Sequence, residues 1–204
     1  MTQAELVPTS LDEETARAEV YGLLAALYYA APSAELHDNI RVAVTEAPAP
    51  GAVLESSWAE LVAVARAQSL AEISSEYDAL FGGVGKPEVY LFGSHYLSGF
   101  LNEKPLAALR TDIAALGLAR GESMPETEDH VAYLCEVMRY LIAGDDVAVA
   151  NLTRQREFTR HAHPWLPMMC EAIMAHPQAR FYGAMAAFTQ TFVSVESQGF
   201  DMLT

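Results

Sequence analysis

The chain has 204 residues, of which 51% are hydrophobic, and this is enough for one ample domain or two small ones with a substantial core. Its 12 basic and 27 acidic residues give a formal net charge of −15. Nucleic-acid binding is disfavoured, because it requires clustered Lys and Arg to neutralise phosphates. A strong negative field instead favours cationic partners, although acidity alone also serves solubility.

Features that would export or anchor the chain are not visible in its pattern. The first ten residues, MTQAELVPTS, contain neither a basic region nor an apolar run, so we expect no signal peptide. No stretch approaches the roughly 18 apolar residues that a membrane span requires. Cys135 and Cys170 lack CxxC spacing and lie among apolar helical residues, which favours reduced core thiols. These features predict a soluble, cytoplasmic protein.

Helical periodicity runs through almost the whole chain, without an internal repeat or a convincing pair of strands. Capping-box patterns at 10–13 and 69–72 predict helix starts with Ser10 and Ser69 as N-caps. The helices predicted in chain order cover residues 10–31, 33–46, a segment around 58–65, 69–81, 105–116, 127–143, 145–162, 167–175 and 178–197. The predicted fold class is therefore all-α, a compact bundle of roughly eight to eleven helices.

Two segments lack clear periodicity. Residues 82–104 are punctuated by glycines and Pro87 and are rich in aromatic side chains for a loop. Residues 118–126 have the composition of a hinge or linker. We therefore expect an N-terminal helical subdomain over 1–120 and a C-terminal one over 127–204, packed together as one globular unit.

A phosphate-binding loop is not supported by the glycines of the sequence GGVGKPE, residues 82–88. Such a loop needs the pattern G-x-x-x-x-G-K-[ST]. Here Leu80 occupies the first glycine position, and Pro87 replaces the hydroxyl that binds Mg²⁺. Nucleotide binding is not predicted.

Metal ligation and hydrolysis also find little support. The sequence contains no H-E-x-x-H and no Cys/His cluster, so no metal and no cofactor is expected. Asp129 and His130 are neighbours, and successive residues on a helix point about 100° apart. Their side chains would not form the acid–imidazole pair of a general base. A small hydrolytic enzyme with a hinge site around Asp129 and His130, assembled with distant residues, is left as an alternative.

The segment MPETEDHVAYLCEVMRYLIAG, residues 124–144, places acids and a histidine ahead of an apolar helical stripe. If Thr127 is the N-cap, the acids of the first turn stabilise the helix dipole and need no further explanation. Alternatively, an acidic hinge beside an aromatic loop receives a peptide that is cationic at one end and apolar next to it. A third possibility is a generic acidic adaptor for a basic protein, with salt-sensitive binding.

Four motifs then follow one another in a specific order: EYDALFGG (76–83), MPETEDH (124–130), HAHPWLPMM (161–169) and RFYGAMAAF (180–188). With them, the chain resembles the TorD/DmsD family of redox-enzyme maturation chaperones over residues 70–190. The resemblance implies a non-catalytic, cytoplasmic all-α protein that binds the twin-arginine signal peptide and the apo-form of a molybdopterin oxidoreductase. Implied clients are reductases for dimethyl sulfoxide or trimethylamine N-oxide and formate dehydrogenases. The molybdopterin cofactor would belong to the client.

The resemblance also implies a signal-peptide-binding site. Asp129 and His130 match the family's acid–histidine pair, and the hinge acids add negative charge. Thr127 stands where many relatives have proline. A monomer is expected, with a domain-swapped dimer formed across 118–126 as the alternative. The complete set of implied site residues is Asp129, His130, Glu126, Glu128, Tyr77, Leu80, Phe81, Pro87 and Tyr90.

Overall fold

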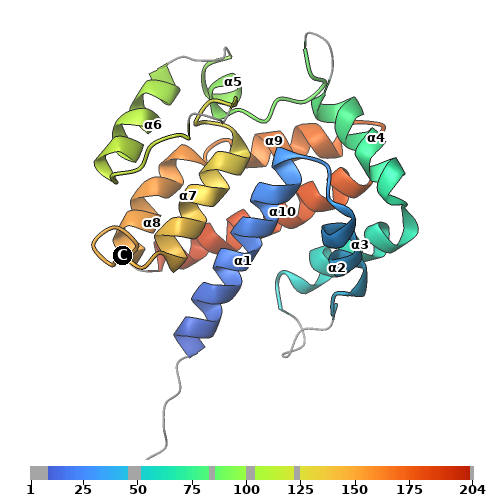
Figure 1. Cartoon of the computed structure of the whole chain (residues 1–204), viewed down its shortest axis with the longest axis horizontal. Helices are drawn as coiled ribbons and strands as arrows, with labels where there is room; N and C mark the ends of the chain where they lie inside the picture. Colours follow the sequence, from blue (N-terminus) through green and yellow to red (C-terminus); the bar gives the residue numbers. More distant parts are fainter. Residues whose placement is uncertain (1–8, 46–51, 83–85, 100–103, 122–124, 203–204) are drawn as a thin grey trace, which may run out of the picture.

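A computed structural model describes residues 9–45, 52–82, 86–99, 104–121 and 125–202. Within these residues the chain forms ten α-helices and one short 3-10 helix, η1 (Figure 1). The elements are α1 (Thr9–Tyr29), α2 (Ala34–Val42), α3 (Glu55–Ala67), α4 (Leu70–Phe81), α5 (Gly93–Ser98), α6 (Lys104–Ala115), α7 (Val131–Ala143), α8 (Leu152–Phe158), η1 (Thr159–His161), α9 (Leu166–Met174) and α10 (Phe181–Asp201). The predicted all-α class is confirmed, and the number of helices lies within the predicted range.

Helices that are far apart in the sequence pack against one another. The blue helix α1 lies against the yellow helix α7, while α10 packs on α9, α3 and α4 (Figure 1). Around this centre, α2 covers α3, α8 covers α7, and α5 contacts both α6 and α9. The predicted subdomain boundary stays a prediction, and residues 122–124 of the expected hinge lie outside the described residues.

Helix α7 is buried on nearly every side. Its apolar stripe is buried, as are Ala132, Val137 and Ile142 outside that stripe. The residues of the stripe are Val131, Leu134, Cys135, Met138 and Leu141. Glu136, Arg139 and Tyr140 lie on its one exposed strip, so most of the helix surface lies in the interior of the bundle. Cys135 and Cys170 are buried thiols, as predicted for core positions.

An ion pair inside the bundle joins α1 to α10. Arg17 donates from Nε to Oε1 of Glu196 at 2.7 Å and from Nη2 to Oε2 at 2.8 Å. The Tyr21 hydroxyl donates to Oε2 at 3.1 Å, and Arg17 also reaches Gln155 of α8 at 3.1 Å. Each oxygen of the buried carboxylate is thus hydrogen-bonded, and such pairs fix how helices fit together more than they add stability.

Sequence patterns located some helix starts correctly and missed others. Ser69 caps α4 in the predicted capping box, because its hydroxyl accepts from the N–H of Glu72 while that carboxylate accepts from the N–H of Ser69. Ser10 is not an N-cap, since α1 begins at Thr9. Thr127 is not one either, because α7 begins at Val131. The acids at 128–129 therefore do not lie in the first turn of α7.

The N-terminus of α10 is capped by a side chain from α4. The Glu76 side chain, on a residue only 6% exposed, accepts the N–H groups of Arg180 at 2.8 Å and Tyr182 at 2.7 Å on Oε1, and that of Phe181 at 3.1 Å on Oε2. The first N–H groups of a helix have no intrahelical partner, and a carboxylate also suits the positive end of the helix dipole. Glu76 thereby fixes α10 against α4.

We predict that Glu76→Ala lowers the free energy of unfolding by about 2–4 kcal/mol, because it leaves the first N–H groups of α10 buried without an acceptor. Urea unfolding followed by circular dichroism measures this. Asp78→Ala, which removes an exposed acid from the same helix, serves as the control and should change stability by about 0.5 kcal/mol or less. Equal effects of the two variants would contradict the capping role.

Candidate functional site

Two extended segments cross where the expected site residues gather. The N–H of Gly93 donates to the carbonyl of Asp129 at 2.9 Å, and the N–H of Val131 donates to the carbonyl of Leu91 at 2.9 Å. Phe92 and His130 face each other in an isolated antiparallel bridge. Glu128 and Asp129 form a turn that is closed by a hydrogen bond from the N–H of His130 to the carbonyl of Thr127 at 3.0 Å. The pairing fixes this turn and places Asp129 and His130 between α5 and α7.

Asp129 is 4% exposed and holds the start of α5. Its Oδ2 accepts from the backbone N–H of Ser94 at 2.9 Å, and its Oδ1 accepts from the Thr127 hydroxyl at 2.6 Å. The N-cap residue Phe92 supplies no side-chain hydrogen bond of its own. Asp129 therefore caps a helix that begins 36 positions earlier in the chain.

His130 is the N-cap of α7. Its Nδ1 accepts from the N–H of Ala132 at 3.2 Å, so the ring is neutral in this role. Burial lowers the pKa of His130 to about 4, although the charge of Asp129 opposes the shift. The ring meets the edge of Phe92 at a centroid distance of 5.0 Å. Because Asp129 and His130 bond to other groups, they form no acid–imidazole pair, as expected from their adjacency.

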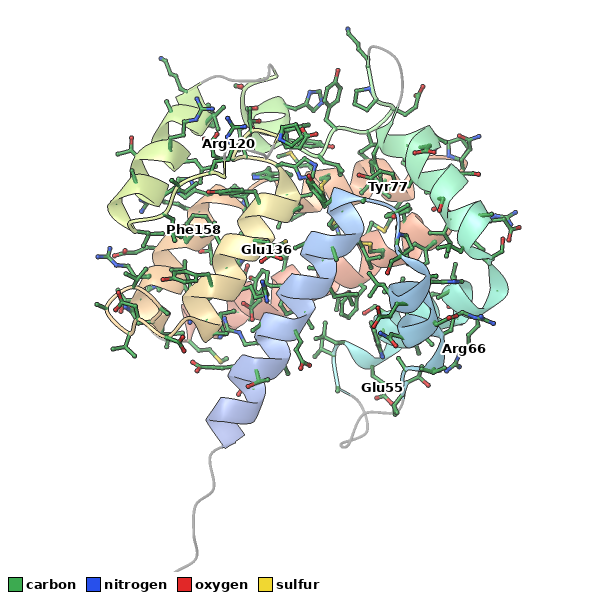
Figure 2. All side chains as sticks on the ribbon, in the orientation of Figure 1. Glu55, Arg66, Tyr77, Arg120, Glu136 and Phe158 are labelled. Atoms are coloured by element: carbon green, nitrogen blue, oxygen red, sulfur yellow. The ribbon has the colours of Figure 1, made fainter. Side chains whose placement is uncertain are left out.

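Glu128 is held by guanidinium groups of the chain itself. Its Oε2 accepts from Nε of Arg110 at 2.9 Å and from Nη2 of Arg110 at 2.8 Å. Arg120 lies 3.7 Å from Oε1 and donates to the carbonyl of Glu126 at 3.0 Å. Figure 2 shows Arg120 near the end of the molecule that carries α5 and α6. The Glu128 carboxylate is therefore already matched by positive charge.

Tyr77 is hydrogen-bonded to the end of α1. Its hydroxyl donates to the carbonyl of Tyr29 at 2.7 Å, and Figure 2 shows it beside the end of α1. Burial, followed by the carboxylates of Glu126 and Asp78, raises the pKa of Tyr77 to about 12. Tyr29 is 47% exposed, and its ring also faces His130. The structure thus brings Tyr77 and His130 together beside the exposed Tyr29.

Leu80 and Phe81 occupy different environments. Leu80 is fully buried, and its carbonyl accepts from the N–H of Val89 at 2.9 Å. Phe81 is partly exposed and packs edge-on against Tyr77 at 5.2 Å and Tyr182 at 5.1 Å. Phe81 and Tyr77 are thus partly accessible at the surface, while Leu80 belongs to the core.

Pro87 and Tyr90 lie in the segment that leads to α5, and both are partly exposed. The Tyr90 ring stacks on His95 with a centroid distance of 4.1 Å, and its carbonyl accepts from the Tyr96 hydroxyl at 2.8 Å. These contacts fix Tyr90 to α5. Partly exposed aromatic side chains thus lie both beside the end of α1, at Tyr77 and Phe81, and before α5, at Tyr90.

A cavity of about 520 Å³ opens between α5, α6 and η1. It is lined by Gly93, Ser94, Leu97, Pro105, Ala108, Leu109, Thr111, Asp112, Asp129, Arg160 and His161. Asp112 Oδ2 lies 2.7 Å from Arg160 and 2.6 Å from Nε2 of His161. Burial alone would raise the pKa of Asp112, but the hydrogen bonds from Arg160 and His161 outweigh it and lower that pKa. Of the expected site residues, Asp129 reaches this cavity.

Comparison with known families places the chain among proteins of one kind. A family model described as the nitrate reductase delta subunit matches residues 48–171, which is more than half of the chain. The chain belongs to the nitrate reductase delta subunit family. This is a family of molybdoenzyme maturation chaperones of the NarJ/TorD type, so the resemblance inferred from the motifs is confirmed. A search of curated proteins finds no match.

Members of the nitrate reductase delta subunit family act on molybdoenzyme subunits as chaperones. Among the described residues, no group of three or more His, Cys, Asp or Glu is arranged to hold a metal ion. No helix in the described ranges is long and apolar enough to cross a membrane. The matched region contains the crossing of residues 91–93 with 129–131 and the whole cavity.

Some important residues of this family member escaped the sequence analysis. Glu76 lies within the motif EYDALFGG, but the helical spacing of that motif is carried by Tyr77, Leu80 and Phe81 and does not mark Glu76. Asp112, Arg160 and His161 meet only through tertiary structure, since 48 positions separate Asp112 from Arg160. No local pattern marks such a cluster. No sequence signal marks α5, because its N-cap residue supplies no side-chain hydrogen bond and the burial of Asp129 is visible only in the structure.

We predict that Gly93→Ala destabilises the protein by about 1–3 kcal/mol through overpacking. An added Cβ would lie 2.7 Å from Nε1 and 2.9 Å from Cε2 of Trp165, whose side chain is fully buried. Gly121→Ala is the matched control, because its added Cβ meets nothing within 4 Å. Thermal and urea unfolding compare the two variants. If Gly121→Ala lowers the free energy of unfolding as much as Gly93→Ala does, the close approach to Trp165 does not explain why residue 93 is glycine.

The His130 cap makes stability depend on pH. The unfolded histidine has a pKa near 6.5, and burial lowers the folded pKa to about 4. Above pH 6.5 neither state binds the proton, so the full stability is present. Between pH 6.5 and 4 the unfolded state binds a proton that the folded state excludes, so stability falls by about 1.4 kcal/mol per pH unit.

His130→Asn keeps an acceptor at the N-cap and removes this titration. We predict that wild type loses about 1–2 kcal/mol more than His130→Asn when the pH falls from 7 to 5. Urea unfolding at the two pH values measures the difference. Burial also lowers the pKa of His163 to about 4, so the variant keeps part of the pH dependence. Equal losses in both proteins would refute the role of His130.

Proposed function

We propose that the protein is a cytoplasmic maturation chaperone that binds the twin-arginine signal peptide and the apo-form of a molybdenum oxidoreductase. The observation that carries this proposal is the position of Asp129. Within the described residues no Lys or Arg pairs with its carboxylate, which lines a cavity of about 520 Å³. Membership of a molybdoenzyme chaperone family supplies the class of client.

A twin-arginine leader is two guanidinium groups followed by an apolar segment, and the site offers a counterpart to each. Carboxylates accept charge-assisted hydrogen bonds from guanidinium, and aromatic grooves receive apolar peptide segments. We assign the cationic end to Asp129 and Glu126. The apolar segment lies on the partly exposed side chains Tyr77, Phe81, Pro87 and Tyr90.

The remaining expected residues act by holding this surface in place. His130 starts α7, Leu80 supports Phe81 from the core, and Glu128 ties α6 to the hinge through Arg110. Binding of this kind is reversible and needs no catalytic group. The molybdopterin cofactor belongs to the client, which is a dimethyl sulfoxide or trimethylamine N-oxide reductase or a formate dehydrogenase in this proposal.

A generic acidic adaptor is the second candidate, and the net charge of −15 favours it. An adaptor of this kind binds any basic peptide through its field and loses affinity uniformly as salt rises. A twin-arginine chaperone instead distinguishes Arg-Arg from Lys-Lys at equal charge, because only guanidinium presents a planar fork of donors to a carboxylate.

We predict that Asp129→Asn weakens binding of a twin-arginine leader about 10- to 100-fold, which corresponds to a lost charge-assisted hydrogen bond. Calorimetric titration with the leader of a molybdoenzyme encoded beside this protein measures it. The melting temperature should hardly change, because an amide can still accept from Ser94 and pair with Thr127. Glu136→Gln, which removes an exposed acid of α7, is the matched control and should bind normally.

Lys-Lys and scrambled leaders of equal charge complete the titration. Preference for Arg-Arg that depends on Asp129 supports the chaperone proposal. Equal binding of all three leaders supports the adaptor instead. If none of them binds, leader recognition at this site is refuted.

A further inference from the structure

We infer that the cavity between α5, α6 and η1 is a subsite for one arginine side chain of the client, and that Arg160 is its internal competitor. The inference rests on the proposed function, because it names where one guanidinium of a basic peptide is held. It adds residues that neither the motifs nor the family comparison assign to a site: Ser94, Asp112, Arg160 and His161.

The shape of the cavity suits a long side chain with a polar tip. Its volume of about 520 Å³ falls in the range of small-ligand sites. One part of the wall is apolar, formed by Leu97, Pro105, Ala108 and Leu109. Methylene groups of an arginine pack on such a wall while the guanidinium reaches the polar groups.

Ser94 provides evidence for a missing hydrogen-bond partner. It lines the cavity and is 1% exposed, yet its hydroxyl has no partner, while its backbone N–H is already bound by Asp129. A buried hydroxyl without a partner is rare and costs about 1–3 kcal/mol. Rotation about one torsion lets this hydroxyl accept from a donor that enters beside Asp129.

The charges of the cavity select a cation. Two carboxylates, Asp112 and Asp129, face one guanidinium, that of Arg160. Burial lowers the pKa of His161, although Asp112 opposes the shift, so the ring is neutral near pH 7 and donates Nε2–H to Asp112. One negative charge is therefore in excess. An anion such as a nucleotide phosphate would meet both carboxylates and is disfavoured.

Arg160 occupies the position that a client arginine would take on Asp112. Its side chain is 59% exposed, so its ion pair with Asp112 is weak and exchangeable. Both Arg160 and His161 bond to Oδ2 of Asp112, so a client guanidinium that takes this oxygen has to displace Arg160. Removing Arg160 frees this carboxylate for the client.

Arg160→Gln therefore strengthens leader binding about 3- to 10-fold, a gain on the scale of one surface ion pair and one removed like charge. Asp112→Asn and Ser94→Ala each weaken it by a similar factor, and Ser94→Ala leaves the melting temperature unchanged or raised because it removes an unpaired hydroxyl. Arg41→Gln is the matched control, because it makes the same charge change at an exposed surface pair, with Asp38, on a helix that does not line the cavity. Equal gains in Arg41→Gln and Arg160→Gln would show that the gain comes from the general field, and would overturn the competitor role.

A second measurement tests the subsite without a leader. N-acetyl-arginine N-methylamide, which carries one guanidinium and no other charge, is titrated into the ¹⁵N-labelled full chain. The amide resonances of Gly93, Ser94 and Leu97 should shift, and should saturate at lower concentration in Arg160→Gln. The lysine analogue should require higher concentrations, since ammonium lacks the planar fork.

The outcomes separate the two proposals. Leader binding without shifts at these three amides overturns the subsite and leaves the proposed function standing. Shifts at the amides without leader binding refute the proposed function and support a guanidinium site. Shifts produced equally by inorganic phosphate would overturn the assignment of a cation.

Discussion

The pairing of two extended segments is the constraint on which the site depends. Two backbone hydrogen bonds, from Gly93 to Asp129 and from Val131 to Leu91, join a segment before α5 to the segment before α7. The same crossing lets the Asp129 side chain cap α5 and lets His130 cap α7. One short contact thus starts two helices and positions the acid that faces the cavity, so the hinge acids have a structural function before any ligand is considered.

The charges near this crossing are distributed unevenly, and that distribution decides which acids can recognise a partner. Glu128 is neutralised by Arg110 and approached by Arg120, whereas Asp112 shares an exposed pair with Arg160. Asp129 receives hydrogen bonds from a hydroxyl and a backbone N–H, neither of which brings a full charge. A count of acids in the sequence would treat Glu128, Asp112 and Asp129 alike. Burial and pairing distinguish them. Glu128 is a structural acid, Asp112 has an exchangeable partner, and Asp129 still lacks a counter-charge.

Much of the fold could be predicted because it follows from local patterns. Apolar spacing located α1 to α4 and α6 to α10 to within a few residues for most ends, and the Ser69 capping box was correct. The start of α7 was missed because an N-cap is inferred from neighbouring residues, while residues 128–129 form a turn and His130 is bridged to Phe92, 38 positions earlier in the chain. The short α5 was missed for the same reason, since its cap comes from Asp129. The cavity could not be predicted, because Asp112 and Arg160 meet only after α6 and η1 have packed.

Charge and geometry act at different ranges on a cationic client. A net charge of −15 attracts any basic peptide and is screened beyond about 10 Å at 0.1 M salt, so it raises the encounter rate without choosing among partners. Choice requires a carboxylate held at fixed geometry, where a planar guanidinium fits and an ammonium does not. The Asp129 carboxylate is held at a fixed geometry, because it accepts hydrogen bonds from the N–H of Ser94 and from the hydroxyl of Thr127. The bonds that stabilise α5 are therefore also those that would make recognition selective.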